Sequence, residues 1–378
     1  MKKTLLTLSI AAVFAVGASA AEFKAGTYTA KAPGIHGDVT VTVTFTKDKI
    51  TDVKVTHSET PGIGSKAAEL LPGRIVERQS PQVDGVTGAT ITSTAIRTAV
   101  ADTVKQAGAD PAALVPLAVK KQAKNETVDT DVVVVGGGGA GMSATIRTRM
   151  NGLNVVLVEK MPFIGGAASI SGGQVVAQGS KLQKAFGVTD DSVESMVKDF
   201  QANGHNLNDL SKLTLYAKNV GPTIDWLHDQ VGVKFIPNDL PFLAEYSHRR
   251  ALEFQGGAGT MAQHLREVIG SNGAKVLFNT RVEKLIVEDG KVTGVEAVDG
   301  NTGTKYTIRA KKTLLTTGGY GNNKNLLTDT YKNTLYYGPV SSTGDGLQMA
   351  QKLGVKTQLL EYGKRYPNGI EVAPGKAK

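Results

Sequence analysis

A glycine-rich turn directly follows a run of valines at Val132–Val135. Gly136, Gly138 and Gly141 have the spacing G-x-G-x-x-G, and Glu159 follows at the separation (roughly 20 residues) expected of a carboxylate that binds an adenosine ribose. The first glycine permits a tight bend, the second lets the backbone approach a pyrophosphate, and the third lets a helix pack closely on the strand. The phosphates then lie at a helix N-terminus, where free N–H groups favour negative charge. The pattern predicts a dinucleotide site, and by itself it is compatible with NAD or FAD.

The hydroxyl of Thr90 is a second candidate for chemistry. It lies in the segment Asp84–Ser93, which has the sequence DGVTGATITS and precedes a stretch with a helical pattern. A phosphoester needs a hydroxyl, and the small residues Gly88 and Ala89 leave space around this one. The alternative is an ordinary turn in which the threonine caps the following helix.

The basic run His248–Arg250 could attract an anion, but its position between two expected domains favours a solvated hinge. The other histidines lack the spacing of metal ligands and the chain has no cysteine, so we predict no metal site. The absence of cysteine also excludes disulfides and a C-x-x-C-H haem attachment. Any redox chemistry must therefore use another cofactor.

An α/β pattern positions the glycine turn. The valine run is typical of a buried strand, a helix-compatible segment follows at 142–150, and a second apolar run at 155–158 ends beside Glu159. Polar, helical sequence then interrupts the strand–helix rhythm and predicts a helical insertion at 190–245. The rhythm returns in a helix at 261–269, strands at 274–278 and 312–316, and a hairpin of 282–288 with 292–298.

A smaller α+β unit precedes this pattern. Alternating residues at 39–46 and a β-rich run at 50–55 predict a β-hairpin, and helix-compatible segments follow at 66–71 and 94–106. The prolines and lysines of 108–128 are typical of a linker. We therefore expect a leader at 1–20, a small domain at 21–107 and a linker at 108–128. An α/β domain then comprises 129–189 and 246–378, and the helical insertion at 190–245 divides it.

Composition and charge place the chain among ordinary globular proteins. It has 378 residues, of which 40% are hydrophobic and 20% charged. Met1–Ala20 combines Lys2 and Lys3 with a short apolar run and a small-residue end, which is the pattern of a secretory signal peptide, so we expect a periplasmic or otherwise exported protein. The net charge is +9, but the basic residues are scattered and predict no nucleic-acid site. They favour anionic substrates or an acidic redox partner.

Several further motifs occur in a characteristic order after Val158. They are EKMPFIGG at 159–166, SGG at 171–173, GGAG at 256–259, TGGY at 317–320 and GDG at 344–346. With these motifs the chain resembles the flavoprotein subunit family of fumarate reductases, in particular its soluble flavocytochrome c and urocanate reductase branch. The resemblance implies a Rossmann-like FAD-binding domain in which the insertion at 190–245 is a mobile clamp that closes over the substrate.

The resemblance also implies which residues contact a non-covalent FAD. Ala167 departs from the pattern, because many members of the family carry Asn there. Together with the glycines of the turn, the expected FAD contacts are Gly136, Gly138, Ala140, Gly141, Glu159, Ala167, Ala168, Gly172, Gly173 and the backbone of Val282.

The segment Asp84–Thr90 resembles the D-x-x-[S/T]-G-A-T pattern of exported FMN-binding domains. In that family a dedicated transferase joins the FMN phosphate to the threonine hydroxyl, which is Thr90 here. The resemblance therefore implies covalent FMN at Thr90, with electrons relayed from this FMN to the FAD.

In the reductases that the chain resembles, a hydride passes from FAD to one carbon of an activated C=C bond, and an arginine protonates the other carbon. The fumarate reductases of this branch have His before a proline that corresponds to Pro367, whereas the urocanate reductases have Tyr, as at Tyr366. A tyrosine can stack on an imidazole ring, although it can also be a packing residue. The resemblance favours urocanate over fumarate and leaves acrylates and cinnamates open.

The family's proton-donating arginine and the second half of its FAD domain lie beyond the position of Tyr366. The resemblance therefore implies that both lie beyond Lys378 and that the chain is a C-terminal truncation. A separate donor, such as a membrane-anchored quinol-oxidising cytochrome, is expected to supply electrons. The alternative interpretation is a non-catalytic flavin protein that only carries electrons.

Overall fold

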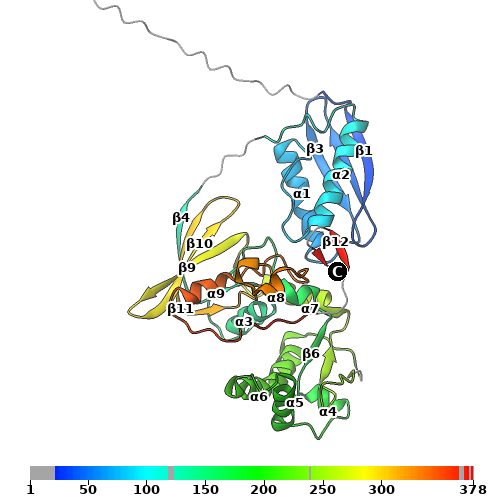
Figure 1. The fold of residues 1–378 in the computed structure, drawn as a ribbon. Coiled ribbons are helices and arrows are strands. Elements are labelled where there is room, and N and C mark those ends of the chain that lie inside the picture. Colours follow the sequence, from blue (N-terminus) through cyan, green and yellow to red (C-terminus); the bar gives the residue numbers. More distant parts are fainter. Residues whose placement is uncertain (1–21, 118–122, 238–239, 366–369, 374–375, 378) are drawn as a thin grey trace, which may run out of the picture.

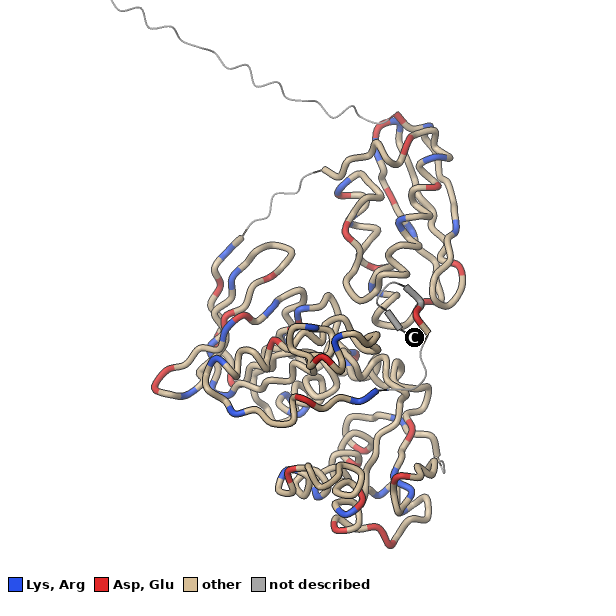
Figure 2. Tube along the Cα trace, in the orientation of Figure 1, with Lys and Arg blue, Asp and Glu red and all other residues tan. Residues whose placement is uncertain are grey.

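The computed structural model describes residues 22–117, 123–237, 240–365, 370–373 and 376–377. The expected signal peptide and Tyr366 lie outside these residues. Figure 1 shows a small sheet-and-helix domain (blue to cyan), a larger α/β domain and a mainly helical part (green) along the chain. Basic and acidic residues are interspersed through all three parts in Figure 2. Within the described ranges, no helix combines the length and apolarity needed to cross a membrane.

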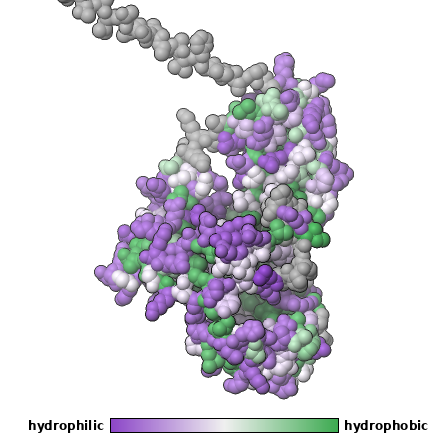
Figure 3. Space-filling model, in the orientation of Figure 1, coloured by the Kyte–Doolittle hydropathy of each residue, from purple (hydrophilic) through white to green (hydrophobic). Residues whose placement is uncertain are grey.

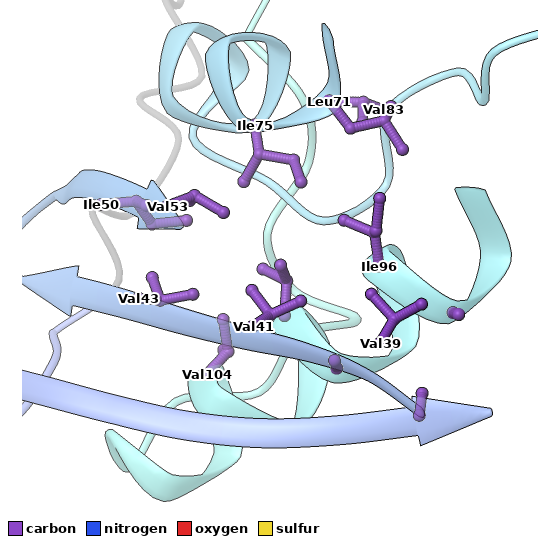
Figure 4. Close-up of a cluster of buried hydrophobic side chains, with 14 of the residues drawn as sticks. Val39, Val41, Val43, Ile50, Val53, Leu71, Ile75, Val83, Ile96 and Val104 are labelled. Carbon is purple, nitrogen blue, oxygen red and sulfur yellow. The ribbon is translucent and has the colours of Figure 1, made fainter. Parts of the chain in front are cut away.

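The small domain is a three-stranded antiparallel sheet with two helices packed against it. Residues of β2 alternate between buried and partly exposed, so Val39, Val41 and Val43 face the helices, where they lie near Ile75 and Ile96 (Figure 4). The predicted hairpin is confirmed by the pairing of β2 with β3. The sheet order is β1-β2-β3, and the elements are β1 (Gly26–Pro33), β2 (Asp38–Phe45), β3 (Ile50–Thr56), α1 (Gly64–Arg78) and α2 (Thr90–Gln106).

Helix α1 extends further than the sequence pattern predicted. The helix-compatible segment was expected at 66–71, but the helix runs from Gly64 to Arg78 with Pro72 inside it. Leu71 and Ile75 are both fully buried, and their burial favours continuation past the lost hydrogen bond. Further along, Leu114 is buried in the same core, within the stretch expected to be a linker.

The α/β domain contains a six-stranded sheet with the order β8-β5-β4-β11-β10-β9. Strand β4 pairs in parallel with both β5 and β11, so Val133 and Val134 are buried on the two sheet faces, which explains the uninterrupted valine run. The predicted hairpin is confirmed as β9 with β10. The elements are β4 (Asn125–Val135), α3 (Gly139–Met150), β5 (Val155–Val158), α7 (Gly257–Ser271), β8 (Lys275–Leu277), β9 (Thr280–Glu288), β10 (Lys291–Asp299), β11 (Lys305–Leu315) and α9 (Asp345–Gln351).

The helical part is inserted into this domain through a two-stranded ribbon. β6 leads into the helices and pairs antiparallel with β7, which leads back out. Ser192 and Asp209 cap the two main helices with side-chain oxygens. The elements are β6 (Gln174–Val176), α4 (Lys181–Ala185), α5 (Val193–Asn203), α6 (Leu210–Trp226), a π-helical turn (Leu227–Val231) and β7 (Ala251–Glu253). The remaining short elements are 3₁₀ turns at Gly166–Ile170 and Lys324–Leu326, α8 (Asp329–Lys332), β12 (Glu371–Ala373) and β13 (Lys376–Ala377).

The expectation of a solvated basic hinge is wrong for Arg250, which is only 1% exposed. Its Nε and Nη2 atoms each donate to Asp191 at 2.7 Å, Nη1 donates to Asp199 at 2.5 Å, and Nη2 also reaches Ser195 Oγ at 3.0 Å. Burial alone would raise the pKa values of the two carboxyls, but the Arg250 hydrogen bonds outweigh it and hold both below the ordinary value of Asp. The guanidinium, just before β7, therefore connects this strand to the start and the middle of α5.

We expect Arg250→Ala to destabilise the protein by about 3–5 kcal/mol, because it leaves buried carboxylates without their cation. The exposed Lys198, on the same helix as Asp199, provides the control, and Lys198→Ala should change stability by no more than about 0.5 kcal/mol. Urea unfolding at neutral pH measures both free energies. Equal stabilities of the two variants would contradict this role of Arg250.

The same ion pairs predict how stability depends on pH. Asp191 and Asp199 have depressed pKa values in the folded state, so their contribution is fully present above the ordinary Asp pKa of 3.8 and is lost as the pH falls below it. Arg250→Ala should therefore lose most of its deficit relative to the parent protein at acid pH.

Candidate functional site

The carboxyl ends of three neighbouring strands meet at one edge of the six-stranded sheet. The register pairs Val135 of β4 with Val158 of β5 and with Leu315 of β11, so the residues that follow these strands lie side by side. A cavity of ≈ 360 Å³ opens at this edge. This is the position at which open α/β sheets bind ligands. The sequence-predicted residues that line it are Gly136, Gly138, Ala140, Glu159, Ala167, Ala168 and Val282.

The glycines of the turn meet different constraints. A Cβ atom on Gly136 would lie 2.6 Å from the Thr316 carbonyl oxygen, and one on Gly141 would lie 1.9 Å from the Gly136 carbonyl oxygen, so only glycine fits. A Cβ atom on Gly138 would meet nothing within 4 Å. Gly138 caps α3, whose first N–H groups have no partner within the helix. The turn thus keeps an open, electropositive space that fits a pyrophosphate.

Glu159 connects the turn to the loop after β5. Its side chain lines the cavity although the residue is only 8% exposed. One carboxylate oxygen accepts from the Gly137 N–H at 2.7 Å and the other from the Met161 N–H at 2.8 Å. Burial raises the pKa of Glu159, and these amides and the nearby lysine only partly offset that rise. The carboxylate therefore fixes the shape of the turn, and the contact of Glu159 with a ribose stays a prediction.

The remaining sequence-predicted residues do not line the cavity. Gly141 packs on the turn itself. The Gly173 carbonyl accepts from the Phe254 N–H, and a Cβ there would lie 3.0 Å from the backbone of Ala258 at the start of α7. Gly172 is exposed next to it.

An ion cluster at the cavity was not found by sequence reasoning. Asp345 accepts from Lys160 Nζ at 3.0 Å and from Arg281 Nη2 at 2.9 Å, and Thr343 Oγ1 donates to it at 2.8 Å. Burial would raise the pKa of Asp345, but the hydrogen bonds from Lys160 and Thr343 and the two positive charges hold it below its usual range. The cluster joins β9, α9 and the loop after β5 around the cavity. The motif at 344–346 indicated the acid, but its cationic partners are distant in the sequence.

Thr90 is the first residue of α2, and Ala89 occupies the cap position. The threonine is therefore not the cap, which was the alternative interpretation of this segment. Its side chain is exposed, and its hydroxyl has no hydrogen bond within the part of the chain that the structure describes. Gly88 before it has a φ of +85°, which turns the chain into the helix.

A buried carboxylate forms a hydrogen bond with the first turn of α2. Glu59, only 4% exposed, accepts hydrogen bonds from Thr92 Oγ1 and from the backbone N–H groups of Ile35 at 2.8 Å and His36 at 3.1 Å. Burial would raise the pKa of Glu59, but these hydrogen bonds hold it below the ordinary value. The ionised group anchors the first turn of α2 and so fixes the position of Thr90.

Two family models match the chain. The model for the FAD binding domain matches residues 131–369, which is more than half of the chain, and the model for the FMN-binding domain matches residues 34–105. The first match includes the cavity and the second includes Thr90.

The chain is similar to two named reductases and to one solved structure. A urocanate reductase of Eggerthella lenta is 33% identical over 93% of this chain and 59% of its own length. An NADH:acrylate oxidoreductase of Vibrio harveyi is 28% identical over 92% of this chain and 41% of its own length. The open conformation of a flavocytochrome c3 fumarate reductase is 34% identical, with a TM-score of 0.56, over 60% of this chain and 40% of that one.

The chain thus spans 59% or less of the length of these relatives. The sheet order, the cavity at its carboxyl edge and the matched models agree on the fold. The chain belongs to the FAD-binding family that includes the flavin-containing fumarate and urocanate reductases, and it carries an FMN-binding domain ahead of its FAD-binding domain.

Proposed function

We propose that the protein is an exported flavin-dependent reductase of an activated C=C bond in a small unsaturated carboxylate, with urocanate as the first candidate substrate. The observation that carries the proposal is the presence of an FMN-binding and an FAD-binding domain in one chain. Such a pair suits a protein that collects electrons at one site and uses them at another. Relatives named for urocanate, acrylate and fumarate support the substrate class.

The residues around the cavity fit a non-covalent FAD. The N–H groups at the start of α3 face the open space beside Gly138 and would hold the pyrophosphate. Glu159 would accept from a ribose hydroxyl. When bound, FAD supplies the hydride for the reaction. The chain's own contribution is to bind and orient the cofactor and, through the Asp345 cluster, to hold the cavity wall in place.

A covalent FMN at Thr90 fits the geometry of the FMN-binding domain. The hydroxyl is exposed to an approaching transferase, and it lies at the N-terminus of α2, where backbone N–H groups favour a phosphate. A separate donor of electrons, such as a membrane-anchored cytochrome, would reduce this FMN. Tyr366, which we propose to contact the imidazole ring of urocanate, lies outside the described residues.

Steady-state assays test the proposal directly. The flavin-loaded protein, expressed from its full coding region, is supplied with chemically reduced viologen under anaerobic conditions together with urocanate or fumarate. We expect dye oxidation with urocanate, a smaller rate with fumarate, and one saturated product molecule for every two viologen cations oxidised. If neither urocanate nor fumarate causes oxidation of the dye, the result would favour the non-catalytic electron carrier.

A further inference from the structure

The segment from Glu159 to Ile170 has two functional faces. Phe163 is not among the residues that line the cavity and instead packs against the core of the FMN-binding domain. A Cβ atom on Gly88 of that domain would lie 3.0 Å from Phe163 Cζ and 3.2 Å from Met161 Cε. The Thr90 turn therefore touches the segment whose other face lines the cavity with Lys160, Gly166, Ala167 and Ala168.

Arg266 of α7 makes a second contact between the two domains. Its Nη2 donates to the Pro61 carbonyl of the FMN-binding domain at 3.3 Å, and its Nη1 donates to the Ile164 carbonyl at 3.1 Å. A Cβ atom on Gly62 would lie 2.2 Å from the guanidinium carbon. In Figure 1, α7 lies on the side of the α/β domain nearest the small domain. Burial lowers the pKa of Arg266, so a desolvated cation lies at this contact.

The two contacts between the domains have the same geometry. In each, the FMN-binding domain presents a glycine with positive φ (Gly62 at +72° and Gly88 at +85°), and the FAD-binding domain presents a large side chain that fills the space a Cβ would take. A side chain at either glycine would separate the domains or displace its partner. The surfaces are therefore matched in shape at two independent points. The face of the molecule drawn in Figure 3 is largely hydrophilic, whereas the Phe163 side chain packs against a hydrophobic core.

We propose that Phe163 and Arg266 form a docking surface for the FMN-binding domain of the same chain, which holds the Thr90 turn against the wall of the FAD cavity for electron transfer. The proposal rests on the proposed function, because it assumes that both flavins are bound. The transfer that it serves removes two electrons and two protons from the reduced FMN and adds the same number to the FAD. Both side chains are positioning residues, because they act through the placement of the domains.

Spin-label distance measurements test the docking without any assay of activity. The chain has no cysteine, so Lys31→Cys and Glu288→Cys, both at exposed positions, introduce one label in each domain. We expect a single narrow distance distribution in the parent protein and a broad one in Phe163→Ala and in Arg266→Ala. Gln263→Ala, on the same helix as Arg266, is the control and should keep the narrow distribution. An unchanged distribution in both test variants would overturn the proposal.

Rapid-reaction kinetics provide the second readout. In Phe163→Ala and Arg266→Ala we expect electron transfer from FMN to FAD to slow by about tenfold, the effect of losing one productive contact. Oxidation of a chemically pre-reduced FAD by urocanate should keep its parent rate, because it needs no docked FMN. If urocanate does not oxidise the reduced FAD of the parent protein, the proposed function is contradicted. The distances between the spin labels would still test the docking. Unchanged transfer in both variants would contradict the docking role.

Discussion

Replacement of Thr90 by alanine is expected to abolish covalent flavin in the FMN-binding domain. The phosphoester needs a hydroxyl, and the exposed Thr90 hydroxyl is the one at the start of α2. After denaturation and gel electrophoresis, flavin fluorescence should stay with the parent chain and be absent from Thr90→Ala. The intact mass should differ by one FMN phosphoester in addition to the substitution.

Thr94→Ala supplies the matched control. Thr94 is an exposed threonine one turn further along α2 and lies outside the D-x-x-[S/T]-G-A-T pattern, so its loss removes a nearby hydroxyl but leaves the reactive one and the pattern in place. This variant should keep its covalent flavin. Fluorescence that survives denaturation in Thr90→Ala, or that disappears only in Thr94→Ala, would place the attachment at another residue.

Replacement of Gly138 by valine is expected to weaken FAD binding without unfolding the protein. Gly138 has a φ of −72°, which any residue adopts, and its Cβ position is open, so the fold accepts a side chain there. The new side chain would occupy the space that we assign to the pyrophosphate. Overpacking of about 1–3 kcal/mol weakens FAD binding by roughly fivefold to 150-fold. Titration of the apoprotein with FAD, followed by flavin fluorescence, measures the change.

Gly270→Ala is the control for this substitution. Gly270 lies in α7 with nothing near its Cβ position, so alanine there should leave FAD binding unchanged and raise helix stability by up to about 1 kcal/mol. Thermal unfolding of the apoproteins should show Gly138→Val to be folded. Parent-like FAD affinity in Gly138→Val would contradict the assignment of the pyrophosphate to this turn.

Local patterns predicted the parts of the structure whose cause lies in nearby residues. The valine run, the spacing of Gly136 and Gly141, and the alternation in β2 each reflect the geometry of a single strand or turn. The hairpin of β9 and β10 was predicted for the same reason. The position of Glu159 beside the glycine turn follows once two adjacent parallel strands are assumed, because both strands end at one edge.

Features that depend on distant residues were not predictable in this way. The sequence does not reveal that Arg250 meets Asp191, because the two are joined only by the folding of the helical insertion. The partners of Asp345 come from β9 and from the loop after β5, so they were missed for the same reason. Strand β1, at 26–33, carries a weak pattern of its own and is recognised through its pairing with β2. The continuation of α1 beyond Pro72 depends on burial in the core.

One measurement tests the central claim most directly. The flavin-loaded protein is reduced fully without oxygen and mixed rapidly with urocanate, while absorbance records the oxidised flavin. The account predicts that FAD is re-oxidised first, that FMN follows as its electrons pass to the FAD, and that dihydrourocanate forms in proportion to the electrons lost. A flavin spectrum that stays reduced in the presence of urocanate and of the other unsaturated carboxylates would contradict a reductase and leave an electron carrier.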